Sequence, residues 1–176
     1  MASSHVVLVG LMGSGKSTVG RQLAVLLGRP FVDNDEQVGA TTGRSVAEIS
    51  LAEGVSEMRR VESEALAQAL AWPTPAVITA AAGTILDEQV RRWLREPFVV
   101  WLRAEPETLA SRVAGDPLRP LLGDQPEAVL RALDQQRSAL YAEVADLSVQ
   151  VDGRAPADVA ASIAAHLPHR RTPSQD

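Results

Sequence analysis

The sequence predicts an α/β fold in which helices cover both faces of a five-stranded parallel sheet. Two observations lead to this prediction. Short apolar runs alternate with segments whose apolar residues recur at helical spacing, and strands separated by helices need crossover connections, which make a sheet parallel. A glycine-rich turn also follows the first apolar run and precedes a helix-like segment. The expected strands are Val6–Val9, Pro30–Val32, Ala76–Thr79, Phe98–Leu102 and Leu147–Val151.

Helix-like segments lie between these runs. One covers Val19–Leu27, and the last is expected to begin at Ala155-Pro156, because proline suits the first turn of a helix. The residues after Leu167 are polar and include prolines, so we expect a flexible tail over about 168–176. No repeat, linker or change of composition divides the chain, which predicts a single domain over residues 1–176.

The composition is that of a globular protein, with 45% hydrophobic and 22% charged residues. A net charge of -5 argues against nucleic acid as the main partner. Because the chain has no cysteine, disulfides, thiolate metal ligands and a cysteine nucleophile are excluded. Its start lacks the features of a signal peptide, and no apolar run approaches the roughly 20 residues of a membrane span. We therefore expect a cytoplasmic protein without a membrane partner; a monomer is the expected state, although no feature of the sequence bears on it.

The first strand runs into a phosphate-binding loop. Gly10 and Gly15-Lys16-Ser17 satisfy the pattern G-x-x-x-x-G-K-[ST] in the strand-then-helix context that the motif requires. Lys16 is expected to reach the β- and γ-phosphates of ATP, and the Ser17 hydroxyl to bind Mg²⁺. A chance match is the alternative, expected in about one chain per hundred. The predicted nucleotide-binding residues of this loop are Gly13, Ser14, Gly15, Lys16, Ser17 and Thr18.

Two carboxylates follow the second strand. Asp33 and Asp35 are two residues apart, which on an extended segment puts both side chains on the same side. Ligands of parallel sheets sit at the carboxyl ends of the strands, so we assign Asp33 to the Mg²⁺ shell and Asp35 to a substrate hydroxyl, whose proton it can accept. The alternative is that an aspartate here caps the following helix.

Three later segments are candidates for substrate contacts. The small residues Ala81-Ala82-Gly83 would let a ligand approach the backbone closely, or would only form a tight turn. The segment 113–124 contains Arg119 between loop-forming residues, which suits a lid over transferring phosphates or an inert surface loop. On a largely apolar helix, Arg137 is either an anion ligand or a surface cation.

A further pair of charged residues has helical spacing. Arg59 and Glu62 are three residues apart and can pair on a helix, which would fix the direction of the guanidinium. Arg60 and Glu64 can pair in the same way, as solvated helix faces commonly do.

Taken together, these stretches resemble the shikimate kinases, a small branch of the nucleoside-monophosphate-kinase-like P-loop families. The resemblance runs from about Val7 to Leu167. Its landmarks, besides the loop through Thr18, are Phe31-x-Asp33-x-Asp35, Gly43-Arg44-Ser45-Val46-Ala47-Glu48-Ile49, Arg59-x-x-Glu62, Arg119-Pro120-Leu121-Leu122 and Arg137-x-x-x-Tyr141-x-x-x-Ala145-Asp146.

The resemblance implies a P-loop kinase that transfers a phosphoryl group from ATP to shikimate, with Mg²⁺ as cofactor, in aromatic amino acid biosynthesis. It implies that Lys16, Asp35 and Arg119 are catalytic, Arg119 by closing over the phosphoryl group. Arg112 and Arg154 would flank the adenine. Ser17, with Asp33 acting through water, would hold the metal.

On the acceptor side, the resemblance implies that Asp35 holds ring hydroxyls and assists deprotonation of the attacking one. Arg59 and Arg137 would clamp the carboxylate, a use that suits planar bidentate donors. The turn Ala81-Ala82-Gly83 would meet the substrate through its backbone.

This side also departs from the family pattern. The turn is a three-glycine sequence in the family, and each new Cβ occupies space near the substrate and disfavours a positive φ. Val55 stands in the place of a glutamate, and Ser50 and Met58 occupy two aromatic positions. The nucleotide side has no such departure. We therefore expect an acidic, hydroxylated acceptor in a reshaped pocket.

Three alternatives to shikimate phosphorylation are open. The chain could phosphorylate another small hydroxy acid, polyol or cyclitol, such as gluconate. It could be a nucleotide-binding homologue with weak or no kinase activity. A nucleoside monophosphate kinase is disfavoured, because the sequence offers no obvious site for a second base.

Overall fold

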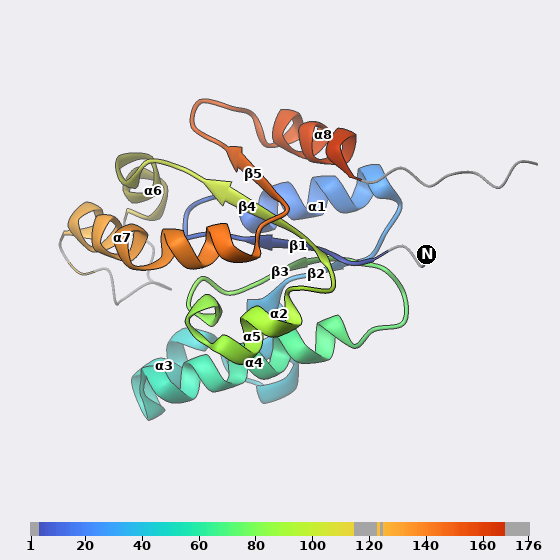
Figure 1. The fold of residues 1–176 in the computed structure, drawn as a ribbon. Coiled ribbons are helices and arrows are strands. Elements are labelled where there is room, and N and C mark those ends of the chain that lie inside the picture. Colours follow the sequence, from blue (N-terminus) through green and yellow to red (C-terminus); the bar gives the residue numbers. More distant parts are fainter. Residues whose placement is uncertain (1–3, 115–122, 124, 168–176) are drawn as a thin grey trace, which may run out of the picture.

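Five parallel strands form one sheet in the order β2-β3-β1-β4-β5 in the computed structural model of the chain, which describes residues 4–114, 123 and 125–167 (Figure 1). This confirms the predicted fold class, and each strand lies within one residue of its expected bounds. The strands are β1 (Val6–Val9), β2 (Phe31–Val32), β3 (Val77–Thr79), β4 (Phe98–Arg103) and β5 (Leu147–Gln150).

Helices connect all of these strands. The first begins at Lys16, three residues before the expected segment, because the glycine turn already ends at Gly15. The helices are α1 (Lys16–Leu27), α2 (Asn34–Thr42), α3 (Val46–Glu53), α4 (Val55–Leu70), the short 3-10 helix η1 (Thr84–Leu86), α5 (Glu88–Trp93), α6 (Pro106–Val113), α7 (Pro126–Val144) and α8 (Pro156–His166). The last starts on its proline, as expected.

The two faces of the sheet are covered by different helices. Val7, Val9 and Trp101 pack with residues of α4, α5 and α7, whereas Leu8 and Leu102 pack with α1 and α8. Alternate residues of a strand point to opposite faces, and both faces here are apolar, which explains why the strand sequences are nearly continuous apolar runs. No described helix is long and apolar enough to span a membrane.

A third, smaller apolar cluster lies between α2, α3 and α4. It contains Val38, Ile49, Val61 and Ala65. Helix α3 begins with a capping box, in which Ser45 and Glu48 satisfy each other's backbone N–H groups. These three helices therefore form a sub-structure with a core of its own.

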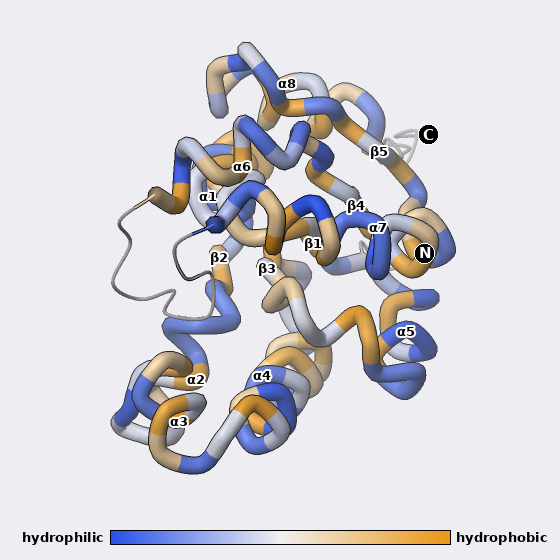
Figure 2. Tube along the Cα trace, turned by 90° about the vertical axis from the view of Figure 1, so that its left-hand side faces the viewer, coloured by the Kyte–Doolittle hydropathy of each residue, from blue (hydrophilic) through white to orange (hydrophobic). Residues whose placement is uncertain are grey.

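The strand order creates a crevice between β1 and β3. The chain leaves β1 toward α1 on one face of the sheet and leaves β3 toward α5 on the other. Ligands of open α/β sheets bind at such a point, outside the carboxyl ends of the strands. Figure 2 faces this edge and shows α2, α3 and α4 below the strands and α6 above them.

The expected lid at about 113–124 and the tail at 168–176 fall outside the described residues, apart from 113, 114 and 123 of the lid. Arg119 falls outside them as well.

Candidate active site

The phosphate-binding loop joins β1 to α1 in a conformation that only glycine adopts easily. Gly10 has φ 141°, and a Cβ built on it would lie 2.5 Å from the carbonyl oxygen of Leu102. Gly15 has φ 89° and directly precedes α1. A side chain at Gly10 would therefore suffer both backbone strain and a clash with β4.

The N-terminus of α1 is open toward this loop. No side chain caps it, and its first turn contains no acidic residue. Unpaired N–H groups and the helix dipole make this end of a helix attractive for an anion. Lys16 Nζ donates to the carbonyl oxygens of Gly10 (2.8 Å) and Leu11 (3.1 Å), which places the ammonium over the loop. Arg112 of α6 also contacts the loop, donating to the carbonyl oxygen of Gly13 (3.1 Å).

Asp33 uses its two carboxylate oxygens differently. Oδ1 accepts from the backbone N–H groups of Asp35 (3.0 Å) and Glu36 (3.4 Å) and thereby caps α2. Oδ2 accepts from the Ser17 hydroxyl at 2.5 Å. Helix capping, the alternative to a metal-binding role for this aspartate, is thus present. The cap uses one carboxylate oxygen and leaves the other for the phosphate-binding loop.

The expectation that Asp33 and Asp35 lie on the same side of an extended segment is wrong. Asp33 has extended backbone angles, but α2 begins at Asn34, so Asp35 belongs to the first helical turn. The strong N-cap preference of aspartate ends the strand here. The Asp35 side chain is exposed, and its charge acts on Glu62 of α4.

On the acceptor side, α4 lies beside the turn after β3. A Cβ built on Gly83 would lie 3.6 Å from Arg59 Nε and 3.8 Å from Glu62 Oε2. The predicted Arg59 and Gly83 are therefore close together, although 24 positions separate them in the sequence. The next residue, Arg60, instead pairs with Glu57 and Glu64 on the exposed face of α4, as expected.

Helix α7 reaches the same turn. Arg137 Nη1 donates to the carbonyl oxygen of Ala82 at 3.1 Å, and the Arg137 side chain is buried. The turn itself has ordinary backbone angles: Gly83 has φ −82°, and no described non-glycine residue has a positive φ. The expected backbone penalty for Ala81 and Ala82 is therefore absent, because this turn does not need the left-handed conformation.

Glu62 is a buried carboxyl at the centre of this group. Burial and the Asp35 carboxylate raise its pKa to about 7, while Arg59, Arg137 and Lys16 oppose the shift. Its Oε2 has no hydrogen-bond partner among residues 4–114, 123 and 125–167.

Two more buried polar atoms near Glu62 also lack a hydrogen-bond partner in the part of the chain that the structure describes. They are Arg137 Nε and Asn34 Oδ1. The Asn34 amide nitrogen donates to the backbone oxygen of Glu62 (3.0 Å), which ties the start of α2 to α4. Buried polar groups are almost always paired in folded proteins, so this group has the character of a site that a polar ligand completes.

A family model described as shikimate kinase matches residues 12–168 of the chain. The chain belongs to the shikimate kinase family. A shikimate kinase of Symbiobacterium thermophilum is 46% identical over 94% of this chain and 97% of its own length. One from Salinispora tropica is 44% identical over 92% of this chain and 96% of its own. The structure of a shikimate kinase from Acinetobacter baumannii in complex with shikimate superposes with a TM-score of 0.89 at 35% identity, covering 93% of this chain and 92% of that one.

Membership of the shikimate kinase family makes the chain a phosphotransferase with a hydroxyl acceptor and ATP as the phosphoryl donor. The likeness stated from the sequence motifs is thereby confirmed.

Mg²⁺ is the cofactor expected with ATP. The described residues suit a Mg²⁺ ion that is held mainly by water and phosphate oxygens, and not one held by protein side chains alone. They contain no cluster of three or more His, Asp or Glu side chains that could hold a metal by themselves. Mg²⁺ commonly keeps several waters and binds through few protein oxygens together with substrate phosphates. Ser17 and Asp33, in contact at the edge of the phosphate-binding loop, provide such a pair.

Two residues of this candidate site were not predicted as site residues from the sequence. Asn34 carries no motif signal, and Glu62 was noted as a helical partner of Arg59 and in the landmark Arg59-x-x-Glu62, without a role in the site. Their burial, at 3% and 6% exposure, is what marks them, and burial follows from the packing of α2 on α4.

Three other expected positions form no side-chain hydrogen bond or ion pair with the loop or the turn among the described residues. Met58 packs against the small cluster between α2, α3 and α4, and Ser50 is half-buried on α3. Arg154 is exposed and donates to the carbonyl oxygens of Gln150 and Asp158 near the start of α8.

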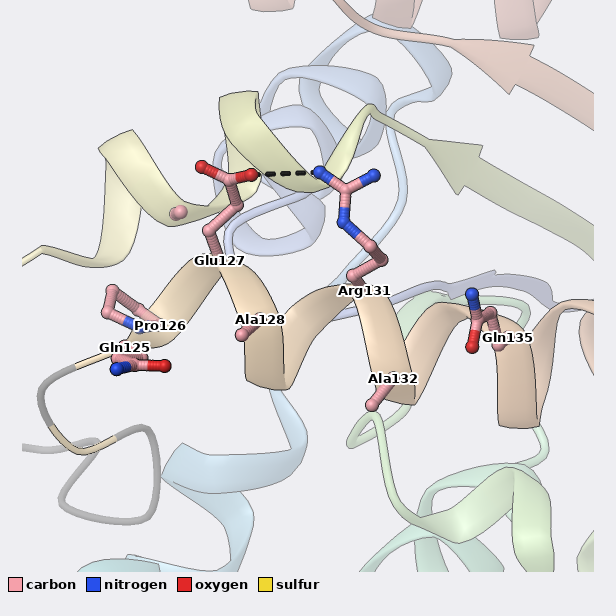
Figure 3. Close-up of a pocket in the computed structure, with 8 residues that line it drawn as sticks. Gln125, Pro126, Glu127, Ala128, Arg131, Ala132 and Gln135 are labelled. Carbon is pink, nitrogen blue, oxygen red and sulfur yellow. Dashed lines mark hydrogen bonds and ion pairs between the residues drawn. The ribbon is translucent and has the colours of Figure 1, made fainter.

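A separate surface cavity of about 660 Å³ lies along α6 and the start of α7 (Figure 3). Its charged lining residues are Glu127 and Arg131, which pair at 2.8 Å. No site residue predicted from the sequence lines this cavity, because its α7 residues lie on the side of that helix away from Arg137. The cavity is lined by Ala110, Gln125, Pro126, Glu127, Ala128, Arg131, Ala132 and Gln135.

Proposed function

We propose that this chain transfers the γ-phosphoryl group of ATP to a hydroxyl of shikimate, forming ADP and 3-phosphoshikimate. The observation that carries the proposal is the arrangement on the two sides of the β1–β3 crevice. The phosphate-binding loop lies on one side, and the arginines and buried carboxyl around the Ala81-Ala82-Gly83 turn lie on the other. A phosphorylated nucleotide suits the first side, and a hydroxylated carboxylate suits the second.

Positioning and charge neutralisation are the main tasks of the protein in such a transfer. On the nucleotide side, the N–H groups of the loop and Lys16 bind the phosphates. Ser17 and Asp33 would hold Mg²⁺, which neutralises phosphate charge when bound. Arg112 and Arg154 would flank the adenine.

On the acceptor side, Arg59 and Arg137 would bind the carboxylate of shikimate. Asp35 would align the attacking hydroxyl and accept its proton as the new O–P bond forms and the bond to the ADP oxygen breaks. Arg119 would neutralise the transferring phosphoryl group from the proposed lid at 113–124. All of these residues come from one chain, so we propose that the monomer is the active species. We also propose that it acts in the cytoplasm.

ADP release from Mg·ATP, measured with and without shikimate in a coupled assay, tests this function. We expect turnover to depend strongly on shikimate. Parallel reactions with gluconate, other hydroxy acids, cyclitols and nucleoside monophosphates serve as controls. ATP binding without shikimate-dependent turnover would contradict the acceptor while leaving the nucleotide site in place. Faster turnover with another acceptor would replace shikimate by that compound.

A further inference from the structure

Two side chains of α7 converge on one backbone oxygen of the acceptor turn. Tyr141 donates its hydroxyl to the carbonyl oxygen of Ala82 at 2.8 Å, and Arg137 Nη1 donates to the same oxygen at 3.1 Å. The two donors are four residues apart, which places them on the same face of the helix. The neighbouring carbonyl of Ala81 accepts from Thr84 Oγ1 at 2.7 Å. Side chains therefore hold two successive carbonyls of this turn.

Tyr141 is well suited to a fixed position. Its side chain is 1% exposed, and its ring lies 5.7 Å from that of Trp101, between centroids. Burial raises the pKa of the Tyr141 phenol above its ordinary value, so the hydroxyl keeps its proton at all pH values relevant to activity. It thus remains a donor throughout.

Arg137 cannot hold the Ala82 carbonyl in the same permanent way. Its buried Nε has no hydrogen-bond partner among the described residues, and a carboxylate bound to the free N–H groups would pull the guanidinium away from the carbonyl. A half-buried carbonyl that loses its donor is costly. Tyr141 would remain as the donor to Ala82 if Arg137 turned toward such a ligand.

We propose that Tyr141 is a positioning residue for the acceptor: its hydroxyl fixes the Ala82 carbonyl, and thereby both the turn and the rest position of Arg137. This rests on the proposed function of the turn and of Arg137. Tyr141 itself need not touch the acceptor. Its effect reaches the acceptor through the Ala82 carbonyl, which Tyr141 and Arg137 share.

Tyr141→Phe tests the proposal, because it removes the hydroxyl and keeps the buried ring. We expect the KM for shikimate to rise about 3- to 10-fold, the range for one lost hydrogen bond. The kcat and the KM for ATP should stay within about twofold. Amide hydrogen exchange of a peptide covering residues 81–84 should become faster, whether or not a substrate is present.

Leu130→Val is the matched control. Leu130 is fully buried on the same helix and in the same core cluster as Tyr141, but its apolar side chain donates no hydrogen bond to the turn. It should lower the melting temperature without changing the KM for shikimate or the exchange of residues 81–84. Because Leu130→Val separates loss of stability from loss of position, a merely structural role of Tyr141 would make the two variants alike.

An unchanged KM together with unchanged exchange in Tyr141→Phe would overturn the proposal. An equal rise of both KM values would also overturn it, because the effect would not be specific to the acceptor. If the unmodified protein shows no shikimate-dependent turnover, the proposed function fails, and hydrogen exchange alone then decides whether Tyr141 fixes the turn.

Discussion

The nucleotide side and the acceptor side of the crevice are built in different ways. The phosphate-binding loop is a single continuous stretch in which Lys16 donates to two loop carbonyls, and Ser17 donates to Asp33 at the end of β2. Of its side-chain atoms, Ser14 Oγ is buried and has no hydrogen-bond partner among the described residues. The acceptor side draws residues from α2, α4, the turn after β3 and α7. Within the described part of the chain, it leaves Glu62 Oε2, Arg137 Nε and Asn34 Oδ1 buried without hydrogen-bond partners.

This difference indicates which interactions fix the conformation of each side. A glycine-rich loop holds its shape through the backbone angles of its own residues, even where its N–H groups point toward the centre of the loop. A site assembled from distant segments holds its shape through packing. Its buried polar atoms without hydrogen-bond partners are available to bind a polar ligand. Substitutions on the two sides should therefore affect different kinetic quantities.

Lys16→Ala should have the largest effect. Removing the ammonium should lower kcat by about 10²- to 10³-fold or more, because it stabilises charge on the transferring phosphates. ADP release measured on folded protein checks this, with the melting temperature as a control for folding. An unchanged kcat would remove the basis for the nucleotide assignment.

Arg59→Ala tests the acceptor side. The KM for shikimate should rise about 10- to 100-fold through loss of a charge-assisted contact to the carboxylate, with a much smaller change in the KM for ATP. Arg60→Ala is the matched control, because Arg60 is the next residue and pairs with Glu57 and Glu64 on the exposed face of α4. If both variants behave alike, the carboxylate clamp lies elsewhere.

Glu62→Gln tests whether the buried Glu62 carboxyl on the acceptor side has a raised pKa. Between pH 4.5 and about 7 the folded chain holds the Glu62 proton while the unfolded chain releases it. The free energy of unfolding should therefore fall as pH rises through this range, by at most ~1.4 kcal/mol per pH unit, and should level off above it.

In the Glu62→Gln variant this contribution disappears, so its stability relative to the unmodified protein should increase from pH 5 to pH 8. Urea unfolding at both pH values measures the difference. Glu64→Gln is the control, because Glu64 is exposed and paired with Arg60 on the same helix. Parallel pH dependences of the Glu62→Gln variant and the unmodified protein would show that Glu62 is not held protonated.

Ala81→Gly and Ala82→Gly should have the smallest effect. The turn has no residue with a positive φ, so glycine relieves no strain and only adds freedom to the unfolded chain. Each variant should lose less than about 1 kcal/mol of stability and change the KM for shikimate by less than about threefold. A tenfold fall in KM on steady-state assay would mean that the alanine side chains obstruct the acceptor.

Particular residues show which features of the structure could be predicted from the sequence. Five strand positions and the start of α8 are predictable from apolar runs and a proline, because these signals are local. The same-side argument for Asp33 and Asp35 failed because Asp33 caps a helix that begins at Asn34, so the extended backbone ends two residues before Asp35. The backbone penalty expected for Ala81 and Ala82 is absent because this turn does not use the left-handed conformation: Gly83 has φ −82°, and neither alanine has a positive φ.

The sequence by itself determined the nucleotide side, since a phosphate-binding loop is encoded by adjacent residues whose glycines set the backbone. Only the tertiary structure decided the acceptor side. Ala82 meets Arg137 and Tyr141 across more than 50 positions of chain, and Asn34 meets Glu62 across 28. Burial and convergence of this kind arise when helices pack on a sheet, and no local pattern records them.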